Sequence, residues 1–445
     1  MLADAETPIT LYHKLSQRQG GAFLLESAGG GEPFGRYSFV GGGLTQTLRI
    51  DGGIGTMFID GEPEELGADP LGALRTALER RRIVMDADLP PFVGGAVGYL
   101  GLGCVQQVAA GGTDNHDSLP QGAFLFADQL VIFDHVRHRL TAMVLIESGS
   151  QQARTEGQKR LNQLVEDVRA PLALPLLHAH PEASEFDEPQ GIPTRAAYVD
   201  AVLRAQEQMV NDEIIRINMS RRWTLTGTVD PLMVYRELRA LEPSPYMYLL
   251  QFDDHHVVGA SSEVLVRVIR GDLTTRLTLR GGARATEYNL LVDMARNDLG
   301  RVAKPGSIAV HNLSRDEHLH STAPPPTSIT GTLDSGFDAI DALNACFPPP
   351  KTTGAPKCRA IAALGELEPH RHSIDAGVVG WFGYDGDLDS CVAQRTIVIG
   401  PEQVNIQVGI GIMHDIDPEE AANCCSAQAR STLLAAQRAQ TRGSS

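Results

Sequence analysis

The stretch from residue 287 to residue 307 constrains the fold most, because it combines a helical apolar pattern with an abrupt stop. Gly300 is placed to end a helix, and Pro305-Gly306 predicts a tight turn after it. The apolar residues that recur at helical spacing are Leu290, Leu291, Met294 and Ala295. The polar residues of the opposite face are Asp293, Arg296, Asn297 and Asp298. We interpret this polar face as one wall of a functional site, with an ordinary solvated helix face as the alternative.

Composition limits the class of protein. The chain has 445 residues and a hydrophobic fraction of 42%, enough for one large domain or two intimately packed ones. No apolar run reaches membrane-spanning length and the N-terminus lacks the features of a signal peptide, so we expect a soluble, cytoplasmic protein that binds no membrane. A formal charge of -17 argues against nucleic-acid binding. An anionic ligand must therefore meet a local positive pocket.

The cysteines show no paired Cys-x-x-Cys spacing, so we expect reduced thiols rather than a zinc site or a disulfide framework. They are Cys104, Cys346, Cys358, Cys391, Cys424 and Cys425.

The chain divides into three regions. Residues 1–169 predict short strands, residues 170–194 form a proline- and histidine-rich linker, and residues 195–445 form a second large region. Glycine clusters in the first region, at residues 29–31, 41–43 and 52–53, predict hairpin turns. The close histidine pairs lack a third ligand nearby and are interpreted as solvated side chains: 178 and 180, 255 and 256, and 370 and 372.

The second region opens with a helix over residues 195–212, whose apolar stripe is Tyr198, Val202, Ala205 and Met209. Strands and helices then alternate. The predicted strands cover residues 214–225, 257–269, 377–384, 390–399 and 404–413. The further predicted helices cover residues 338–346, 355–367 and 418–440, and residues 385–387 predict a hairpin turn.

The 287–307 stretch closely resembles the Leu-Val-Asp-Leu-x-Arg-Asn-Asp-Leu-Gly-Arg signature of the chorismate-utilising enzymes, and of the anthranilate synthase component I family in particular. The resemblance extends over nearly the whole chain. It implies an α+β fold of two large, mainly antiparallel sheets with helices outside. Residues 24–27 (Leu-Leu-Glu-Ser) and 243–247 (Pro-Ser-Pro-Tyr-Met) match elements that help form the feedback site of tryptophan-regulated members.

The resemblance also implies a magnesium ion, held by glutamates at i and i+3 on two facing helices, because Mg²⁺ prefers several oxygen ligands. The matching positions here are Arg284 and Glu287 on one helix and Ala421 and Cys424 on the other. Only Glu287 is a carboxylate, and a long acidic stretch of the family before the signature is missing. We therefore expect that the magnesium ligands are lost and that no cofactor is bound.

Other positions carry new charge where the family has different residues, and a buried charge is costly without a partner or a ligand. The family histidine expected near Pro324 is absent unless His320 replaces it. The elements that resemble carboxylate grips are retained at residues 354–357, 395–396 and in a turn at 409–411. The candidate substrate-binding residues are Arg216, Arg280, Lys351, Lys357, Arg395, Thr396, Gly409, Ile410 and Gly411. The candidate acid–base groups are Glu287, Asp375 and His414.

The leading hypothesis is a repurposed, magnesium-independent lyase, isomerase or cyclase for a small carboxylated cyclic or enol substrate, in specialised metabolism. One alternative is a non-catalytic protein that binds tryptophan or a chorismate-like acid. The other is a working anthranilate or aminodeoxychorismate synthase subunit. Whether a glutamine amidotransferase subunit docks stays open, although residues 102–106 have lost the family's Tyr-Asp-x-Val-Arg element. The oligomeric state, a homodimer included, also stays open.

Overall fold

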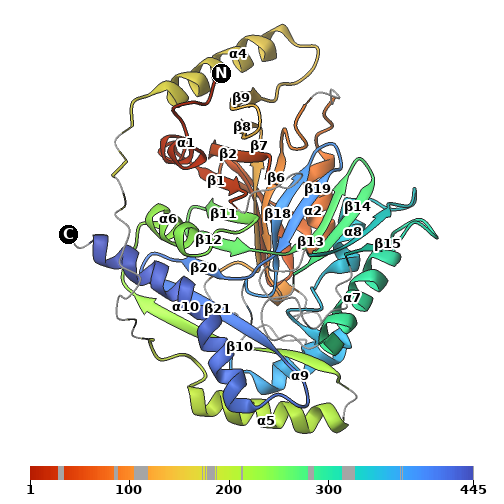
Figure 1. Ribbon diagram of the computed structural model, residues 1–445. Helices are drawn as coiled ribbons and strands as arrows, with labels where there is room; N and C mark the ends of the chain where they lie inside the picture. The colour runs from red at the N-terminus through yellow and green to blue at the C-terminus, as the bar shows by residue number, and fades with distance from the viewer. Residues whose placement is uncertain are drawn as a thin grey trace.

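The computed structural model describes residues 1–28, 35–84, 89–104, 119–172, 174–175, 177, 186, 188–211, 214–278, 285–312, 326–370, 372 and 374–443. Two large sheets dominate this part of the chain, and every paired neighbour within them is antiparallel (Figure 1). The predicted fold of two large antiparallel sheets with helices outside is confirmed.

The first sheet has ten strands within the described residues. Their order is β17 (Gly354–Ala355), β10 (Arg216–Thr226), β21 (Gln403–Ile412), β20 (Thr396–Ile399), β12 (His256–Ser261), β11 (Tyr246–Gln251), β1 (Gly21–Glu26), β2 (Tyr37–Leu44), β8 (Gln129–Asp134) and β9 (Arg139–Val144).

The second sheet has eleven strands within the same residues. Their order is β15 (Ala309–His311), β16 (Thr327–Thr332), β14 (Asp272–Leu277), β13 (Val264–Ile269), β19 (Leu388–Val392), β18 (Val378–Gly383), β6 (Gly95–Leu100), β7 (Gly122–Ala127), β3 (Gln46–Asp51), β4 (Ile54–Ile59) and β5 (Glu62–Gly67). Regions 1–169 and 195–445 contribute strands to both sheets, so that β1 lies beside β11 and β6 beside β18.

Helices cover the outer faces of both sheets (Figure 1). Those against the first sheet are α1 (Pro8–Leu15), α4 (Gln151–Arg169), α5 (Arg195–Asn211), α6 (Pro231–Leu241), α9 (Lys357–Leu367) and α10 (Pro418–Gly443). Those against the second are α2 (Pro70–Glu79), α7 (Ala285–Gly300) and α8 (Ala339–Cys346). The predicted stripe of α5 is confirmed, since all four of its residues are buried.

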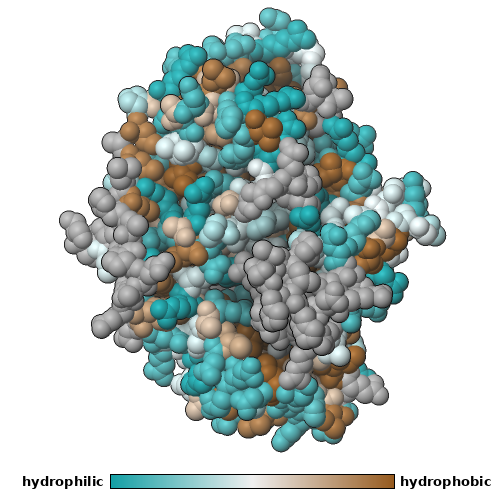
Figure 2. Space-filling view, viewed as in Figure 1, coloured by the Kyte–Doolittle hydropathy of each residue, from teal (hydrophilic) through white to brown (hydrophobic). Residues whose placement is uncertain are grey.

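Aromatic side chains fill the space between the sheets, where Phe23 and Phe39 of the first sheet belong to one core with Tyr99 of the second. Burying such large apolar side chains is the main stabilising contribution to a fold of this kind. On the face shown in Figure 2, hydrophobic residues occur in small groups between hydrophilic ones. Among the described helices, none combines the length and the apolar character that crossing a membrane would need.

Two predicted strands are each wrong in the same way, because the chain changes sheets within them. Residues 257–269 divide into β12 and β13, and residues 390–399 divide into β19 and β20. Glu263 lies at the first crossing, and Arg395, with a φ of 45°, lies at the second. Apolar residues resume directly after each crossing, so each pair of strands resembles one longer strand in the sequence.

The glycine clusters differ from one another in the structure. Gly52 and Gly53 form the predicted turn, with φ values of 59° and 80°. The turn prediction for residues 41–43 is wrong, because they lie inside β2. Glycine is needed there since a Cβ at Gly41 would lie 2.3 Å from the Phe23 ring. Residues 29–31 lie outside the described residues.

The cysteines of the chain are all free, as predicted. The interpretation of the histidine pairs as solvated is wrong for His255 and His372, which are buried. His255 contacts the Tyr99 hydroxyl at 2.9 Å through Nε2 and stacks on Phe252, so it joins the two sheets. Residues 178 and 180 lie outside the described residues.

Candidate functional site

Six charged side chains form three ion pairs where β10, α7, α9 and the β12–β13 crossing meet. We call them the charged cluster. The pairs are Arg216–Glu287, Lys351–Glu263 and Lys357–Asp298.

Arg216 is the most buried cation of the charged cluster. It opens β10 and is only 2% exposed, and its Nε donates to Glu287 Oε1 at 2.7 Å. Its Nη1 also donates to the carbonyl oxygen of Pro350 at 3.3 Å. Glu287 lies in the first turn of α7 and is partly accessible, with 16% of its side chain exposed. A buried guanidinium is costly without such partners, so this pair fixes the start of α7 against β10.

Lys351 contacts the carboxylate of Glu263, which is 1% exposed, while the lysine side chain is 27% exposed. Its Nζ also donates to the carbonyl oxygen of Thr278 at 3.4 Å. Burial, with the positive charges of Arg216 and Arg395, lowers the pKa of Lys351 to about 7. Lys351 can therefore gain or lose a proton near neutral pH, and it is the member of the pair that a ligand can reach.

Lys357 opens α9 and lies 2.7 Å from Asp298 Oδ2, and its Nζ also donates to the carbonyl oxygen of Cys346 at 3.4 Å. Burial raises the pKa of Asp298, and Lys357 opposes that rise. Asp298 belongs to the signature stretch, so the signature helix α7 contributes to two of the three pairs.

The other three residues of the polar face of α7 favour the alternative interpretation, a solvated helix face. Asp293, Arg296 and Asn297 are exposed. Arg296 Nη2 donates to Asp293 Oδ1 at 2.6 Å, and Asn297 Nδ2 donates to Asp293 Oδ2 at 3.4 Å. They form a solvated helix face, which was the alternative interpretation.

A cavity of about 30 Å³ lies between Glu263, Asp298 and Lys351, with Leu291, Cys346 and Pro349 among its apolar lining. Small-molecule sites usually measure about 300–1,000 Å³. This cavity is therefore too small for a ring-sized acid as it stands, and neither Arg216 nor Glu287 lines it.

The residues at the family's magnesium positions do not fit a magnesium ion. Glu287 is bound to a guanidinium, Ala421 is a buried apolar residue, and Cys424 is exposed. A positive charge 2.7 Å from the carboxylate opposes binding of a divalent cation. Within the residues that the structure describes, no three His, Cys, Asp or Glu side chains are grouped to hold a metal. Arg284 lies outside those residues.

Residues 395–396, at the crossing between β19 and β20, and residues 409–411, in β21, were expected to bind a substrate carboxylate. In the structure their polar groups contact other parts of the chain. Arg395 Nε donates to the Ala260 carbonyl oxygen at 2.9 Å, and its Nη2 donates to Ser244 Oγ at 3.5 Å, while its charge acts on Lys351. Thr396 Oγ1 lies 2.7 Å from the Tyr248 hydroxyl. The expected turn at 409–411 is wrong, because Gly409, Ile410 and Gly411 lie inside β21 and pair with β10.

Gly411 provides the space for the Arg216 guanidinium, since a Cβ at this position would lie 2.0 Å from Arg216 Nη2. We expect Gly411→Ala to displace Arg216 and to lower the free energy of unfolding by about 1–3 kcal/mol. Chemical denaturation measures the effect. The control is Gly365→Ala in α9, where a Cβ meets open space. Equal stability of both variants would show that Arg216 moves freely.

Asp375 belongs to a second buried group, which we call the histidine cluster: Ser220, Glu368, His372, Asp375 and Gln407. His372 Nε2 lies 2.7 Å from Glu368 Oε2, and its Nδ1 lies 3.5 Å from Asp375 Oδ2. Ser220 Oγ donates to Glu368 Oε1 at 2.9 Å, and Gln407 Nε2 donates to Ser220 Oγ at 2.9 Å.

The charges of the histidine cluster compensate one another. Despite burial, Glu368 and Asp375 raise the pKa of His372 to about 10. The pKa of Glu368 is lowered, because His372 outweighs the effect of burial. Burial raises the pKa of Asp375, which His372 partly opposes. The catalytic role of Asp375 stays a prediction.

His414 lies apart from both clusters. It is exposed after β21, and Gln206 Nε2 donates to its carbonyl oxygen at 3.1 Å. It lines a separate pocket of about 480 Å³ with Met209, Ile214 and Met413. Arg280 and His320 lie outside the described residues, so nothing is added to their predicted roles.

The sequence analysis missed Glu263, Glu368 and His372. Glu263 interrupts the apolar run 257–269, and a charged residue inside such a run signals a partner or a function. Glu368 and His372 give no comparable signal, because acidic and histidine residues after a helix are usually solvated.

The two elements that match the tryptophan feedback site lie side by side. Glu26 of β1 pairs with Met247 of β11. The Glu26 carboxylate is buried and accepts hydrogen bonds from the Tyr235 hydroxyl at 2.7 Å and from Arg239 at 2.8 Å.

Comparison with known proteins agrees with this architecture. The chorismate binding enzyme family matches residues 31–278 and 284–433. Anthranilate synthase component 1 of Pseudomonas putida is 34% identical over 98% of this chain and 94% of its own. The protein of the same name from Streptomyces coelicolor is 34% identical over 99% of this chain and 88% of its own.

Solved structures share the fold. Anthranilate synthase component I of Streptococcus pneumoniae has a TM-score of 0.76 at 24% identity and covers 97% of this chain and 99% of its own. The menaquinone-specific isochorismate synthase of Escherichia coli has a TM-score of 0.68 at 16% identity and covers 97% of this chain and 92% of its own. The chain therefore belongs to the chorismate binding enzyme family, and anthranilate synthase component 1 proteins are among its relatives.

Proposed function

We propose that this chain is a magnesium-independent enzyme that acts on a small carboxylated cyclic or enol acid, by elimination, rearrangement or cyclisation. The observation that carries the proposal is the contact of the partly exposed Lys351 with the buried Glu263, beside the Arg216–Glu287 pair. Burial and the charges of Arg216 and Arg395 lower the pKa of Lys351 to about 7. Such a group exchanges protons near neutral pH, which is what proton transfer during an elimination or rearrangement requires.

The neighbouring cations supply substrate binding in this proposal. A substrate carboxylate replaces Glu287 on the Arg216 guanidinium, because charge-assisted hydrogen bonds to a guanidinium are strong. Lys351 then removes or supplies a proton, and Glu263 positions its ammonium. Arginine itself stays protonated, so Arg216 acts by its charge alone. An enzyme of this kind fits a specialised pathway better than tryptophan synthesis.

Two alternatives each have an observation in their favour. The identity of 34% over nearly the whole chain to anthranilate synthase component 1 proteins favours a working anthranilate synthase subunit. The pairing of Glu26 with Met247 favours a protein that binds tryptophan. Docking of a glutamine amidotransferase stays a prediction that depends on the first alternative.

An assay with chorismate, magnesium and ammonium salt distinguishes the proposals. We expect no anthranilate fluorescence that chelator removes, because the residues at the magnesium positions do not fit the ion. Chorismate should still bind in chelator by calorimetry, and Lys351→Met and Arg216→Met should each weaken binding about tenfold or more. Lys304→Met, a change at an exposed lysine, is the matched control.

Chelator-sensitive anthranilate formation would replace the proposal with the anthranilate synthase alternative. No turnover and no chorismate binding, together with thermal stabilisation by tryptophan, would favour the tryptophan-binding alternative.

A further inference from the structure

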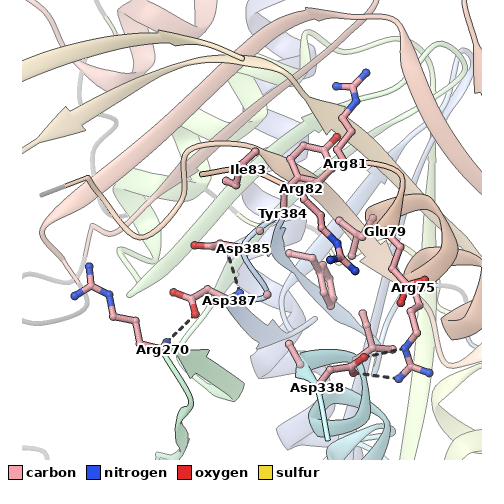
Figure 3. Close-up of a pocket in the computed structure, with 16 residues that line it drawn as sticks. Arg75, Glu79, Arg81, Arg82, Ile83, Arg270, Asp338, Tyr384, Asp385 and Asp387 are labelled. Carbon is pink, nitrogen blue, oxygen red and sulfur yellow. Dashed lines mark hydrogen bonds and ion pairs between the residues drawn. The ribbon is translucent and has the colours of Figure 1, made fainter. Parts of the chain in front are cut away.

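A cavity of about 780 Å³ lies at the tip of the β18–β19 hairpin (Figure 3). Its walls come from the end of α2 and the residues after it, from the start of α8, from the hairpin and from Arg270. Its volume is typical of a small-molecule site. No residue of the charged cluster lines it, so it is separate from the proposed active site.

One side of this cavity carries two carboxylates, each of which accepts a hydrogen bond from a backbone N–H. Asp387 is 8% exposed and its Oδ1 accepts from the Arg270 backbone N–H at 2.7 Å. Asp385 Oδ1 accepts from the Asp387 backbone N–H at 3.2 Å. Neither carboxylate has an ion pair among the described residues. Burial raises the pKa of both, that of Asp387 to about 6, and Asp385 adds to this rise. An ammonium group bound beside them would offset the free-energy cost of holding the two carboxylates charged in a buried position.

Another part of the wall carries guanidinium groups. Arg75 is neutralised by Asp338 and Asp341 at 3.0 and 2.6 Å. Arg81 donates to the Gln46 side chain at 3.0 Å and faces the Tyr384 ring, with 5.9 Å to its centroid. Arg82 is exposed and has no ion pair in the described part of the chain. In Figure 3 the Arg81 side chain extends away from Arg82, so Arg82 is the one of these two arginines that can receive a carboxylate in the cavity.

Apolar side chains lie among these charges. Phe382 and Tyr384 are buried at 2% and 8% exposure, and Leu78, Ile83, Ala339 and Ile340 also belong to the apolar lining. Figure 3 shows Asp385 and Asp387 close together beside Arg270, with Arg75 and Asp338 in another part of the cavity. A ligand that uses all of this lining needs an ammonium, a carboxylate and an apolar body.

We propose that this cavity binds a small zwitterion of the α-amino acid type, with its ammonium at Asp385 and Asp387 and its carboxylate at Arg82. A simple anion is disfavoured by the two aspartates, and a simple amine is disfavoured by the arginines, because like charges repel. The proposal does not depend on the reaction at the charged cluster.

Calorimetry with matched probes tests the proposal. The probes are L-phenylalanine and L-leucine, with 3-phenylpropanoate and 2-phenylethylamine as analogues of phenylalanine that lack one charge each. We expect at least one of the two amino acids to bind, and each one-charge analogue to bind about tenfold or more weakly than phenylalanine does.

Two variants of the cavity test whether the amino acid binds there. Asp387→Asn keeps an oxygen for the Arg270 N–H, and Arg82→Ala removes an exposed side chain, so both should fold. Each should weaken amino acid binding about tenfold or more. Glu26→Gln, in the tryptophan-type element, should leave it unchanged. Failure of both amino acids to bind at about 1 mM overturns the proposal. Binding that survives both cavity variants, or that only Glu26→Gln removes, also overturns it.

Discussion

Replacing Glu287 with alanine is expected to lower the free energy of unfolding by about 3–5 kcal/mol in the presence of chelator. The substitution leaves the Arg216 guanidinium, whose side chain is 3% exposed, buried without its carboxylate. The Pro350 carbonyl oxygen at 3.3 Å is a weaker partner for a full charge. Denaturant unfolding measures the change, provided that the free energy of unfolding depends on denaturant concentration with the same slope in both proteins.

Substitution of the other member of the ion pair, Arg216, provides an internal control. Arg216→Met should cost less, because Glu287 keeps 16% exposure and water can reach its carboxylate. The double variant Arg216→Met/Glu287→Ala should be more stable than the sum of the two single losses predicts, and the difference measures the coupling of the pair.

The same experiment tests whether Glu287 is a magnesium ligand. If Glu287 were a magnesium ligand, its loss would have little effect in chelator, and Mg²⁺ would stabilise the parent protein but not the variant. That result would contradict both the pairing of Arg216 with Glu287 and the magnesium-independent function.

The fold was predictable from sequence because its signature is long and local. The Gly300 and Pro305-Gly306 pattern defines one helix and its end, and the resemblance then supplies the two sheets. Periodicity did not reveal the crossings at Glu263 and Arg395, because apolar residues resume within a few positions after each of them. Which sheet a strand joins depends on partners that are distant in sequence.

The candidate site was predictable in part for the same reason. Arg216, Lys351 and Lys357 could be identified because they replace or retain residues within recognisable motifs. The sequence does not show which carboxylate each of these cations contacts, because Lys351, for example, pairs with Glu263, 88 residues away. In the sequence alone these three cations look free to bind an anion. In the folded chain each of them forms an ion pair with a carboxylate of the protein.

The buried His372 should contribute stability that depends on pH with a definite sign. Glu368 and Asp375 raise its pKa in the folded protein to about 10, from an ordinary value of 6.5. This contribution is fully present below pH 6.5 and is lost as the pH rises through 10, where the folded protein also releases the proton. His372→Asn should therefore cost about 3–5 kcal/mol at pH 6, because Glu368 is left buried beside a neutral side chain.

Denaturant unfolding of the parent protein and of His372→Asn at pH 6, 8 and 10 checks this expectation, and only the difference between them is compared, since other groups titrate in both. The difference should shrink towards pH 10. His135→Asn is the matched control, because burial lowers the pKa of His135, and its difference should stay constant from pH 8 to pH 10. A difference for His372→Asn that is the same at every pH would mean that the imidazole is neutral in the core. The histidine cluster would then stabilise the fold by packing and hydrogen bonding rather than by charge, and Asp375 would lack the cationic neighbour that opposes the rise in its pKa.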